Sequence, residues 1–214
     1  MEAYYAQRAP IYDASMGYDD PERVARLEPV VAALEDALSG RSVLEVACGP
    51  GFWTERVSKF AKSVVATDLN DSVLALTRQR FAGVPNVRIE QVDAYQLPSD
   101  LGPFDAAFAV DWLAHVPNSR MHEFLVGLHA QLESGSRVVF CDGLPRAGSL
   151  TGVHDGDGNH LQVRELPDGS RHRVIKHFLS DEETRELLRP YSTEVEILTL
   201  SGAGRRVVSY RLAE

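Results

Sequence analysis

The chain has 214 residues, of which 44% are hydrophobic and 25% are charged, as expected for one globular domain with a buried core. Its net charge of −9, with no run of Lys or Arg, argues against a nucleic-acid partner, because a phosphate backbone requires a concentrated basic face. No apolar run approaches the roughly 20 residues of a membrane span, and the first residues lack a signal-like stretch. The only cysteines, Cys48 and Cys141, indicate no disulfide framework, so we expect a cytoplasmic protein without a membrane partner.

The first 40 residues are predicted to be helical. Apolar residues recur at helical spacing between Val24 and Leu38, and Gly40 ends the pattern. Pro29 falls inside this pattern, so it marks either a break or the start of a second helix.

Between residues 42 and 142, short apolar runs alternate with helical patterns. The strand-like runs are 42–47, 63–68, 87–92, 104–110 and 137–142, and the helical patterns are 52–61, 71–81 and 119–133. Such alternation predicts right-handed βαβ crossovers and a parallel sheet with helices on both faces.

The last third of the chain has a different pattern. Residues 160–178 are extended around Pro-Asp-Gly, which is typical of a hairpin turn. Residues 179–188 begin a helix with a capping box, and residues 192–201 and 205–214 are strand-like runs joined by "GAG". We therefore expect a terminal antiparallel hairpin, with the adjacent arginines in "AGRRVV" on a solvated strand edge.

The stretch "VLEVACGPGFWTERV", residues 43–57, places a glycine loop between a strand and a helix. Dinucleotide-binding folds have G-x-G-x-x-G at this point, where the third glycine allows close packing around a pyrophosphate. Gly49 and Gly51 match the first two positions, but Thr54 occupies the third. The glycine pair alone leaves the ligand open.

Three acidic residues lie on or just after successive strands. Glu45 is inside the first strand, Asp68 closes the second and Asp93 follows the third. A lone strand-end aspartate is most often a turn former, and Glu45 could form a structural ion pair. Ligands bind at the carboxyl ends of such strands, however, so three acids in series favour a binding site.

In this order the motifs resemble those of the class I S-adenosylmethionine-dependent methyltransferases. "VLEVACGPGFWT" is similar to their first motif, E/D-x-x-x-G-x-G, and "VVATDLN" to the second, which contains an acidic ribose ligand. "VDAYQLP" resembles the adenine-binding segment, and "FDAAFAVDWLAHVP" the fourth motif. The resemblance covers residues 41–142, and the terminal hairpin agrees with the antiparallel seventh strand of the family.

The resemblance implies an α/β fold with a Rossmann-like seven-stranded sheet, mostly parallel with an antiparallel C-terminal strand and helices on both faces. It implies a single methyltransferase domain over residues 1–214. The expected parts are an N-terminal helical cap (1–40), a cofactor-binding core (41–142), a hairpin substrate cover (143–177), and a C-terminal helix and hairpin (178–214).

The implied cofactor is S-adenosyl-L-methionine. Backbone around Ala47, Gly49 and Gly51 should approach its methionyl part, because glycine has no side chain in the way. Glu45 should help to hold its α-amino group, directly or through water.

The resemblance places the nucleoside at the next two strands. Asp68 should accept hydrogen bonds from the ribose hydroxyls, with Leu69 against the adenine ring. Asp93 should accept from the adenine amino group, helped by the backbone of Ala94. Val110, at the end of the fourth-motif strand, completes this expected set.

Two tyrosines and two titratable residues complete the expected site. The N-terminal "YYAQRAPIYD" resembles a cap in which a tyrosine reaches the cofactor carboxylate, with Tyr12 preferred over Tyr5. A base assists methyl transfer to a hydroxyl or a protonated amine, and His115 and then Asp111 are the candidates. "HVP" could equally be a loop-shaping element.

The cover segment holds His154, His160, His172 and His177, any of which could reach the acceptor. "HDGDGNH" resembles the start of a calcium loop, but His160 stands where glycine is needed, so we expect no metal there.

The expected function is methyl transfer to an oxygen or nitrogen of a small molecule, as in secondary metabolism. A homodimer is compatible with the sequence. The alternatives are a non-catalytic cofactor-binding member and an NAD-dependent oxidoreductase, which Thr54 and the terminal hairpin disfavour.

Overall fold

The structure is a computed structural model that describes residues 2–192 and 194–213. A seven-stranded sheet has the order β3-β2-β1-β4-β5-β9-β8. All neighbours are parallel except β9, which pairs antiparallel with both β5 and β8. The strands are β1 (Ser42–Val46), β2 (Ser63–Asp68), β3 (Val87–Gln91), β4 (Phe104–Val110), β5 (Leu132–Gly143), β8 (Val195–Leu200) and β9 (Arg205–Arg211). The predicted Rossmann-like fold with one antiparallel strand is confirmed.

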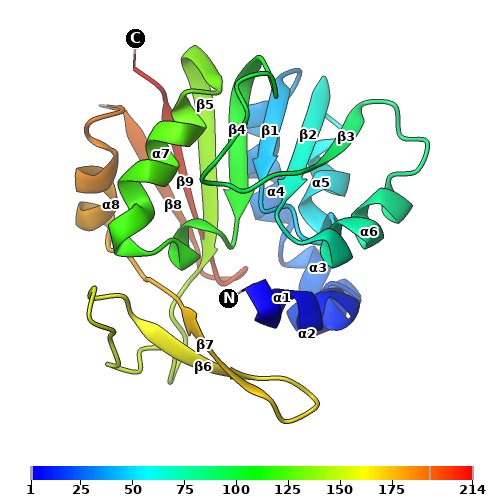
Figure 1. The fold of residues 1–214 in the computed structure, drawn as a ribbon. Helices are drawn as coiled ribbons and strands as arrows, with labels where there is room; N and C mark the ends of the chain where they lie inside the picture. Colours follow the sequence, from blue (N-terminus) through cyan, green and yellow to red (C-terminus); the bar gives the residue numbers. More distant parts are fainter. Residues whose placement is uncertain (1, 193, 214) are drawn as a thin grey trace.

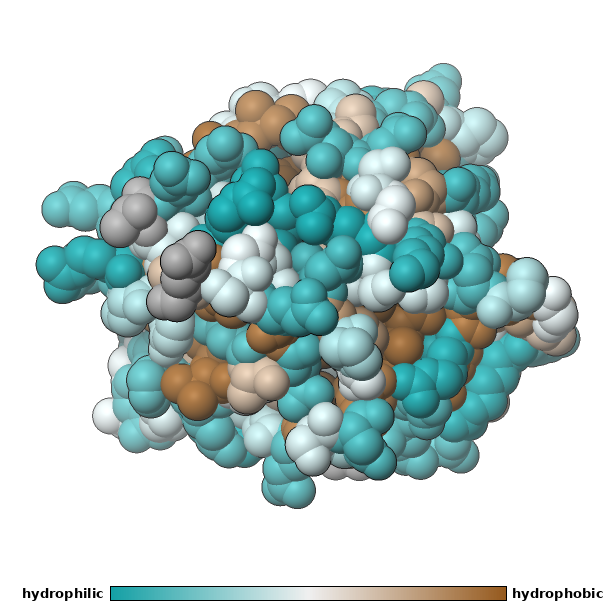
Figure 2. Space-filling model, turned by 90° about the horizontal axis from the view of Figure 1, so that it is seen from above, coloured by the Kyte–Doolittle hydropathy of each residue, from teal (hydrophilic) through white to brown (hydrophobic). Residues whose placement is uncertain are grey.

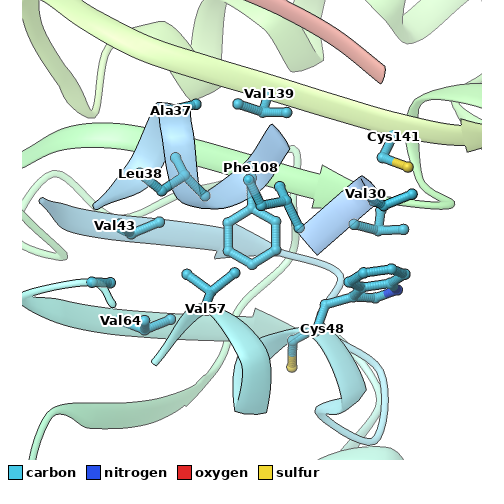
Figure 3. Close-up of a cluster of buried hydrophobic side chains, with 14 of the residues drawn as sticks. Val30, Ala37, Leu38, Val43, Cys48, Val57, Val64, Phe108, Val139 and Cys141 are labelled. Atoms are coloured by element: carbon cyan, nitrogen blue, oxygen red, sulfur yellow. The ribbon is translucent and has the colours of Figure 1, made fainter. Parts of the chain in front are cut away.

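Two hydrophobic clusters fill the space on either side of the sheet. One joins α4 (Glu28–Leu38), α5 (Phe52–Val57) and α6 (Asp71–Arg80) to the strands, and Figure 3 shows Leu38 and Val57 beside Phe108 of β4. The other joins α7 (Met121–His129) and α8 (Asp181–Leu188) to the opposite face. Because both faces are covered, the central strands are mainly apolar, and Glu45 of β1 is a buried exception.

The N-terminal residues form short helices. These are α1 (Glu2–Arg8), the 3-10 turn η1 (Ala9–Ile11), α2 (Tyr12–Met16) and α3 (Pro21–Ala25), followed by α4. Pro29 lies in the first turn of α4, so it marks the start of a second helix. Val30, Leu34 and Leu38 of α4 are buried against the sheet. Within residues 1–40, α4 is thus part of the core.

Several predicted boundaries were wrong by a few residues. The helix predicted over 52–61 ends at Val57 and continues as turns. The helix predicted over 119–133 ends at His129, and β5 begins at Leu132 instead of residue 137. The register shift in the pairing of β5 with β4 explains the longer strand, because it places Leu132 opposite Phe104.

The predicted hairpin and the predicted C-terminal helix are both present, and two short turns were not predicted. β6 (Leu161–Glu165) and β7 (Arg171–Ile175) form a separate antiparallel hairpin, and two short 3-10 turns, η2 (Leu113–His115) and η3 (Asn118–Arg120), follow β4. The capping box of α8 is present, with the Ser180 and Glu183 side chains each bonded to the other's backbone N–H. Among the described residues, no helix has the length and apolar character needed to cross a membrane.

The N-terminal helices and the β6–β7 hairpin lie at one edge of the sheet. Figure 1 shows α1, α2 and the hairpin below the end at which the parallel strands finish. Figure 2 views the molecule from the opposite edge, where the surface is mainly hydrophilic with small scattered apolar areas. In an open α/β sheet ligands bind beyond the carboxyl ends of the strands. The site is therefore expected between the strand ends and the layer formed by α1, α2 and the hairpin.

Candidate active site

The loop after β1 has left-handed backbone at three positions. The φ angles are 56° at Ala47, 56° at Gly49 and 88° at Gly51. A Cβ at Gly51 would lie 2.6 Å from the ring of Phe81, so only glycine fits both the conformation and the space. The loop therefore leads into α5 through two glycines that carry no side chain of their own.

Glu45 and Thr54 form a buried pair. The Thr54 hydroxyl donates to Glu45 Oε2 at 2.6 Å, and Glu45 is 2% exposed. Burial raises the pKa of Glu45 to about 8, although the Thr54 hydrogen bond opposes this shift. Thr54, in the place of a third glycine, thus holds the carboxyl group in a fixed orientation.

Asp68 joins the end of β2 to the glycine loop. Its Oδ2 accepts from the Gly49 backbone N–H at 3.1 Å, and Oδ1 accepts from the Asn70 N–H at 2.9 Å. Burial raises the pKa of Asp68, and these backbone hydrogen bonds counteract the shift. Each carboxylate oxygen retains a lone pair that could accept a ligand hydroxyl.

Three other residues were predicted to contact the nucleoside and follow β2 or β3, whereas Val110, predicted only to contact the cofactor, ends β4. Asp93 Oδ1 accepts from the Tyr95 N–H at 2.9 Å, which is a local turn. Among the described residues, no hydrogen bond joins the Asp93 side chain to Asp68. Ala94 is buried, Val110 is 9% exposed at the end of β4, and Leu69 is 45% exposed after β2. An exposed Leu69 provides an apolar surface that a planar ring could cover.

The two candidate tyrosines both line a cavity of about 1000 Å³. Tyr12 lies over the glycine loop, because its Cε1 would be 4.0 Å from a Cβ on Gly49. The Tyr5 ring meets His115 edge-on, with 6.1 Å between centroids. Burial raises the pKa of both phenols, so they stay protonated at neutral pH and can donate hydrogen bonds.

His115 lies in η2 and also lines this cavity. Its Nδ1 is hydrogen-bonded to the carbonyl oxygen of Ile175 in β7, which can only accept. Nδ1 therefore carries the proton, and Nε2 keeps a free lone pair. Burial, reinforced by the charge of Lys176, lowers the pKa of His115 to about 3, so the imidazole is neutral at neutral pH.

Asp111 is held in an ion-pair network at the end of β4. Its Oδ1 accepts from Arg205 Nη1 at 2.6 Å and lies 3.8 Å from Lys176 Nζ, which is 3.3 Å from Asp142. Burial raises the pKa of Asp111, but the charges of Arg205 and Lys176 together lower it by more, so the net shift of the pKa is downward. A carboxylate stabilised in this way is a weak base.

The interpretation of "AGRRVV" as a solvated strand edge was wrong for Arg205. Arg205 is 2% exposed, whereas Arg206 pairs with the exposed Asp181. The reason is that β9 lies between β5 and β8 and is not an edge strand. Successive side chains of a strand face opposite sides of the sheet, so Arg205 and Arg206 have different surroundings. The buried Asp111 opposite it could not be recognised from the sequence.

The cavity also has a strongly basic lining that the sequence did not predict. Its basic residues are Arg8, Arg23, Arg26, Arg146, Arg164, Lys176 and Arg205. Of the four histidines expected to reach an acceptor, His154, His160, His172 and His177, none lines it. His160 instead bonds to the Lys176 carbonyl, and the Asp155 carboxylate closes its own loop by accepting from Asp157 and Asn159.

Comparison with known proteins gives a consistent result. A family model described as "Methyltransferase domain" matches residues 43–135. The ubiquinone biosynthesis O-methyltransferase of Xanthomonas axonopodis pv. citri is 30% identical over 177 residues, covering 80% of this chain and 69% of that protein. The demethylmenaquinone methyltransferase of Clavibacter sepedonicus is 31% identical over 130 residues, covering 60% of this chain, which spans only about half (49%) of that relative.

Solved structures agree over nearly the whole chain. A complex of DhpI with SAM and HEP is 28% identical with a TM-score of 0.78, covering 97% of this chain and 94% of that one. A 1,6-didemethyltoxoflavin-N1-methyltransferase of Burkholderia thailandensis, with its substrate and S-adenosylhomocysteine bound, is 20% identical with a TM-score of 0.65. It covers all of this chain and 87% of that one, and its likeness concerns the fold alone.

Proposed function

This chain belongs to the class I S-adenosylmethionine-dependent methyltransferases, and we propose that it transfers a methyl group from that cofactor to an oxygen or nitrogen of a small molecule. The observation that carries the proposal is the hydrogen bond between Asp68 and the Gly49 backbone. It joins the expected ribose ligand to the expected methionyl loop in one site. The O-methyltransferase relative supports an oxygen acceptor.

The residues around the loop fit the cofactor by the chemistry of their polar groups. Asp68 offers carboxylate lone pairs to the ribose hydroxyls, and Asp93 offers its second oxygen to the adenine amino group. The buried carboxyl of Glu45 would ionise on meeting an ammonium group, since an opposite charge favours the charged form. Backbone at Ala47, with Gly49, leaves room for the methionyl chain.

Tyrosines and apolar residues complete the proposed cofactor site. Tyr12, above Gly49, is the preferred donor to the cofactor carboxylate, and Tyr5 is the second candidate. Leu69, Ala94 and Val110 would surround the adenine ring.

The cofactor supplies an electrophilic methyl group on a sulfonium. That methyl group would pass to the lone pair of an acceptor oxygen or nitrogen, and the electrons of the carbon–sulfur bond would remain on sulfur. The protein contributes mainly by holding the acceptor in line at attack distance. The lowered pKa of His115 makes it a weak base before the reaction, although a stronger one than Asp111. His115 would therefore take the proton at Nε2 only as the methyl group is transferred, when the acceptor oxygen becomes strongly acidic, and its Nδ1–H stays bonded to Ile175.

Asp111 has a different proposed part. Its lowered pKa makes it a weak base, so we assign it to orienting Arg205 and Lys176 beside the reacting atoms. α1, α2 and the β6–β7 hairpin, which lie below the strand ends in Figure 1, would exclude water from that side of the site.

The partners and the location are proposals that the sequence and the cavity lining support. We propose a free small molecule as acceptor and no nucleic acid, because the chain is acidic overall and its basic residues gather inside a cavity. A cytoplasmic location agrees with two free, buried cysteines. A homodimer would be tested by sedimentation.

Calorimetry tests the function. S-adenosylhomocysteine should bind the purified protein, and NAD should not. A screen of hydroxyl and amine acceptors with labelled cofactor, read by mass spectrometry, should then yield a methylated product. Tight NAD binding without a response to S-adenosylhomocysteine would refute the assignment, and cofactor binding without any product would favour a non-catalytic member.

A further inference from the structure

The cavity beside Tyr12 and His115 is positively charged in a chain of net charge −9. Among the residues that the structure describes, seven that line it are Arg or Lys, and one, Asp111, is acidic. An acidic protein that concentrates basic side chains around one cavity creates a local field of the opposite sign to its net charge.

Part of this charge is balanced by acids within the protein. Arg205 and Lys176 share Asp111, Lys176 also approaches Asp142, and Arg26 lies 4.0 Å from Glu22. Among the side chains that the structure describes, the remaining four cavity arginines have no carboxylate partner within 4.0 Å. They are Arg8, Arg23, Arg146 and Arg164.

Arg23 and Arg146 converge at the turn between β8 and β9. Arg23 Nη1 donates to the carbonyl of Ala203 at 3.2 Å, and Arg146 Nη2 would lie 3.8 Å from a Cβ on the adjacent Gly204. Burial lowers the pKa of Arg23, and the neighbouring charges of Arg205 and Arg146 lower it further. This repulsion between like charges is what a bound anion would relieve.

We propose that the methyl acceptor carries an oxyanion, either a carboxylate or a phosphorus oxyanion, which binds between Arg23 and Arg146. This inference rests on the methyltransferase function proposed above. Guanidinium groups bind such oxyanions through paired, charge-assisted hydrogen bonds. Since the same cavity is lined by His115 and Asp111, an acceptor anchored at Arg23 and Arg146 points its other end toward the residues assigned to the reaction. Arg8 and Arg164 add to the field at the hairpin side.

The test measures anion binding to the complex of the protein with S-adenosylhomocysteine. Inorganic phosphate, methylphosphonate and acetate are titrated at constant ionic strength, with acetamide as the uncharged counterpart of acetate, and binding is followed by NMR. The R23Q/R146Q double variant is compared with R173Q. Arg173 is an exposed arginine of β7 that does not line the cavity, and therefore controls for lost charge alone.

At least one oxyanion should bind saturably, whereas acetamide should not. The double variant should bind that oxyanion at least tenfold more weakly, and R173Q within twofold of wild type. Preference for phosphate and methylphosphonate, or for acetate, then identifies the class of oxyanion. Absence of saturable binding, or equal binding by the double variant, would overturn the proposal. If the wild-type protein does not bind S-adenosylhomocysteine, the proposed function is refuted instead. The two failures are distinguishable, because an anion titration of the protein alone still reports on the arginines.

Discussion

The glycine loop and the arginine-lined cavity adjoin at Tyr12, but they differ in charge and in how the chain builds them. The loop side is acidic, with Glu45, Asp68 and Asp93 on or after consecutive parallel strands. The cavity side is basic, and its residues come from α1, α3, the segment after β5, the hairpin and β9. One side presents acceptors for hydroxyl and ammonium groups, and the other presents donors for an anion.

This difference suggests a division of labour. Glu45 and Asp68 belong to strands of the sheet and Asp93 follows one, so we expect the proposed cofactor side to be rigid. The basic groups belong mainly to segments added around the sheet, where substitutions need not disturb the core. Acceptor specificity can therefore change while the cofactor site is kept.

The largest expected effect separates catalysis from cofactor binding. H115Q should lower kcat by about 10²–10⁴-fold if Nε2 takes the acceptor proton, since this is the usual contribution of general base catalysis. The affinity for S-adenosylhomocysteine should stay within twofold. Steady-state kinetics with the acceptor found in the screen and calorimetry measure the two quantities. An unchanged kcat would leave His115 a loop-shaping residue.

The next effect concerns the buried ion pair on the basic side of the site. R205M should lower the free energy of unfolding by about 3–5 kcal/mol, because it leaves Asp111 buried without its closest partner. Urea unfolding measures the change, with R173M as the matched control at an exposed arginine. A loss below about 1 kcal/mol in R205M would mean that the ion-pair network does not stabilise the fold.

The acidic side could be predicted from the sequence for a physical reason. Parallel strands bring their carboxyl ends to one edge, so acids spaced by one βα unit must lie near one another. The alternation of strand-like and helical runs predicted the sheet, whereas turn residues predicted both hairpins and the spacing of Ser180 and Glu183 predicted the α8 capping box. Helix ends were less predictable, because the last turn of α7 competes with strand pairing that begins at Leu132.

The basic side could not be predicted, because no local pattern links its residues. Arg23 and Arg146 meet only after α3 and the segment following β5 reach the β8–β9 turn. Arg205 looked like a surface residue until β9 was placed between two strands. The left-handed φ of Ala47 has no sequence signal either, since alanine rarely adopts this conformation.

A smaller effect tests the electrostatics of the acidic side. Burial raises the pKa of Glu45 from 4.5 to about 8, so between these values the folded protein binds a proton that the unfolded chain has lost. This contribution to stability is present below about pH 4.5 and is lost as pH rises toward 8. E45Q should therefore gain about 3–4 kcal/mol relative to wild type between pH 5 and pH 8, since one pH unit corresponds to about 1.4 kcal/mol over most of this range. Urea unfolding of the ligand-free proteins across this range measures the difference, and parallel curves would show that Glu45 is already ionised.

The most direct test of the two-sided site is the affinity for S-adenosylhomocysteine in D68N and R146Q, measured by calorimetry beside the wild type. Asp68 would bind the ribose through charge-assisted hydrogen bonds, each worth about 1.5–3 kcal/mol, so D68N should weaken binding at least tenfold. Asn keeps an acceptor oxygen for the Gly49 N–H, and circular dichroism checks that the fold is intact. R146Q, on the basic side, should bind within twofold of wild type. Unchanged affinity in a folded D68N, or an equal loss in R146Q, would contradict the assignment of cofactor and acceptor to opposite sides.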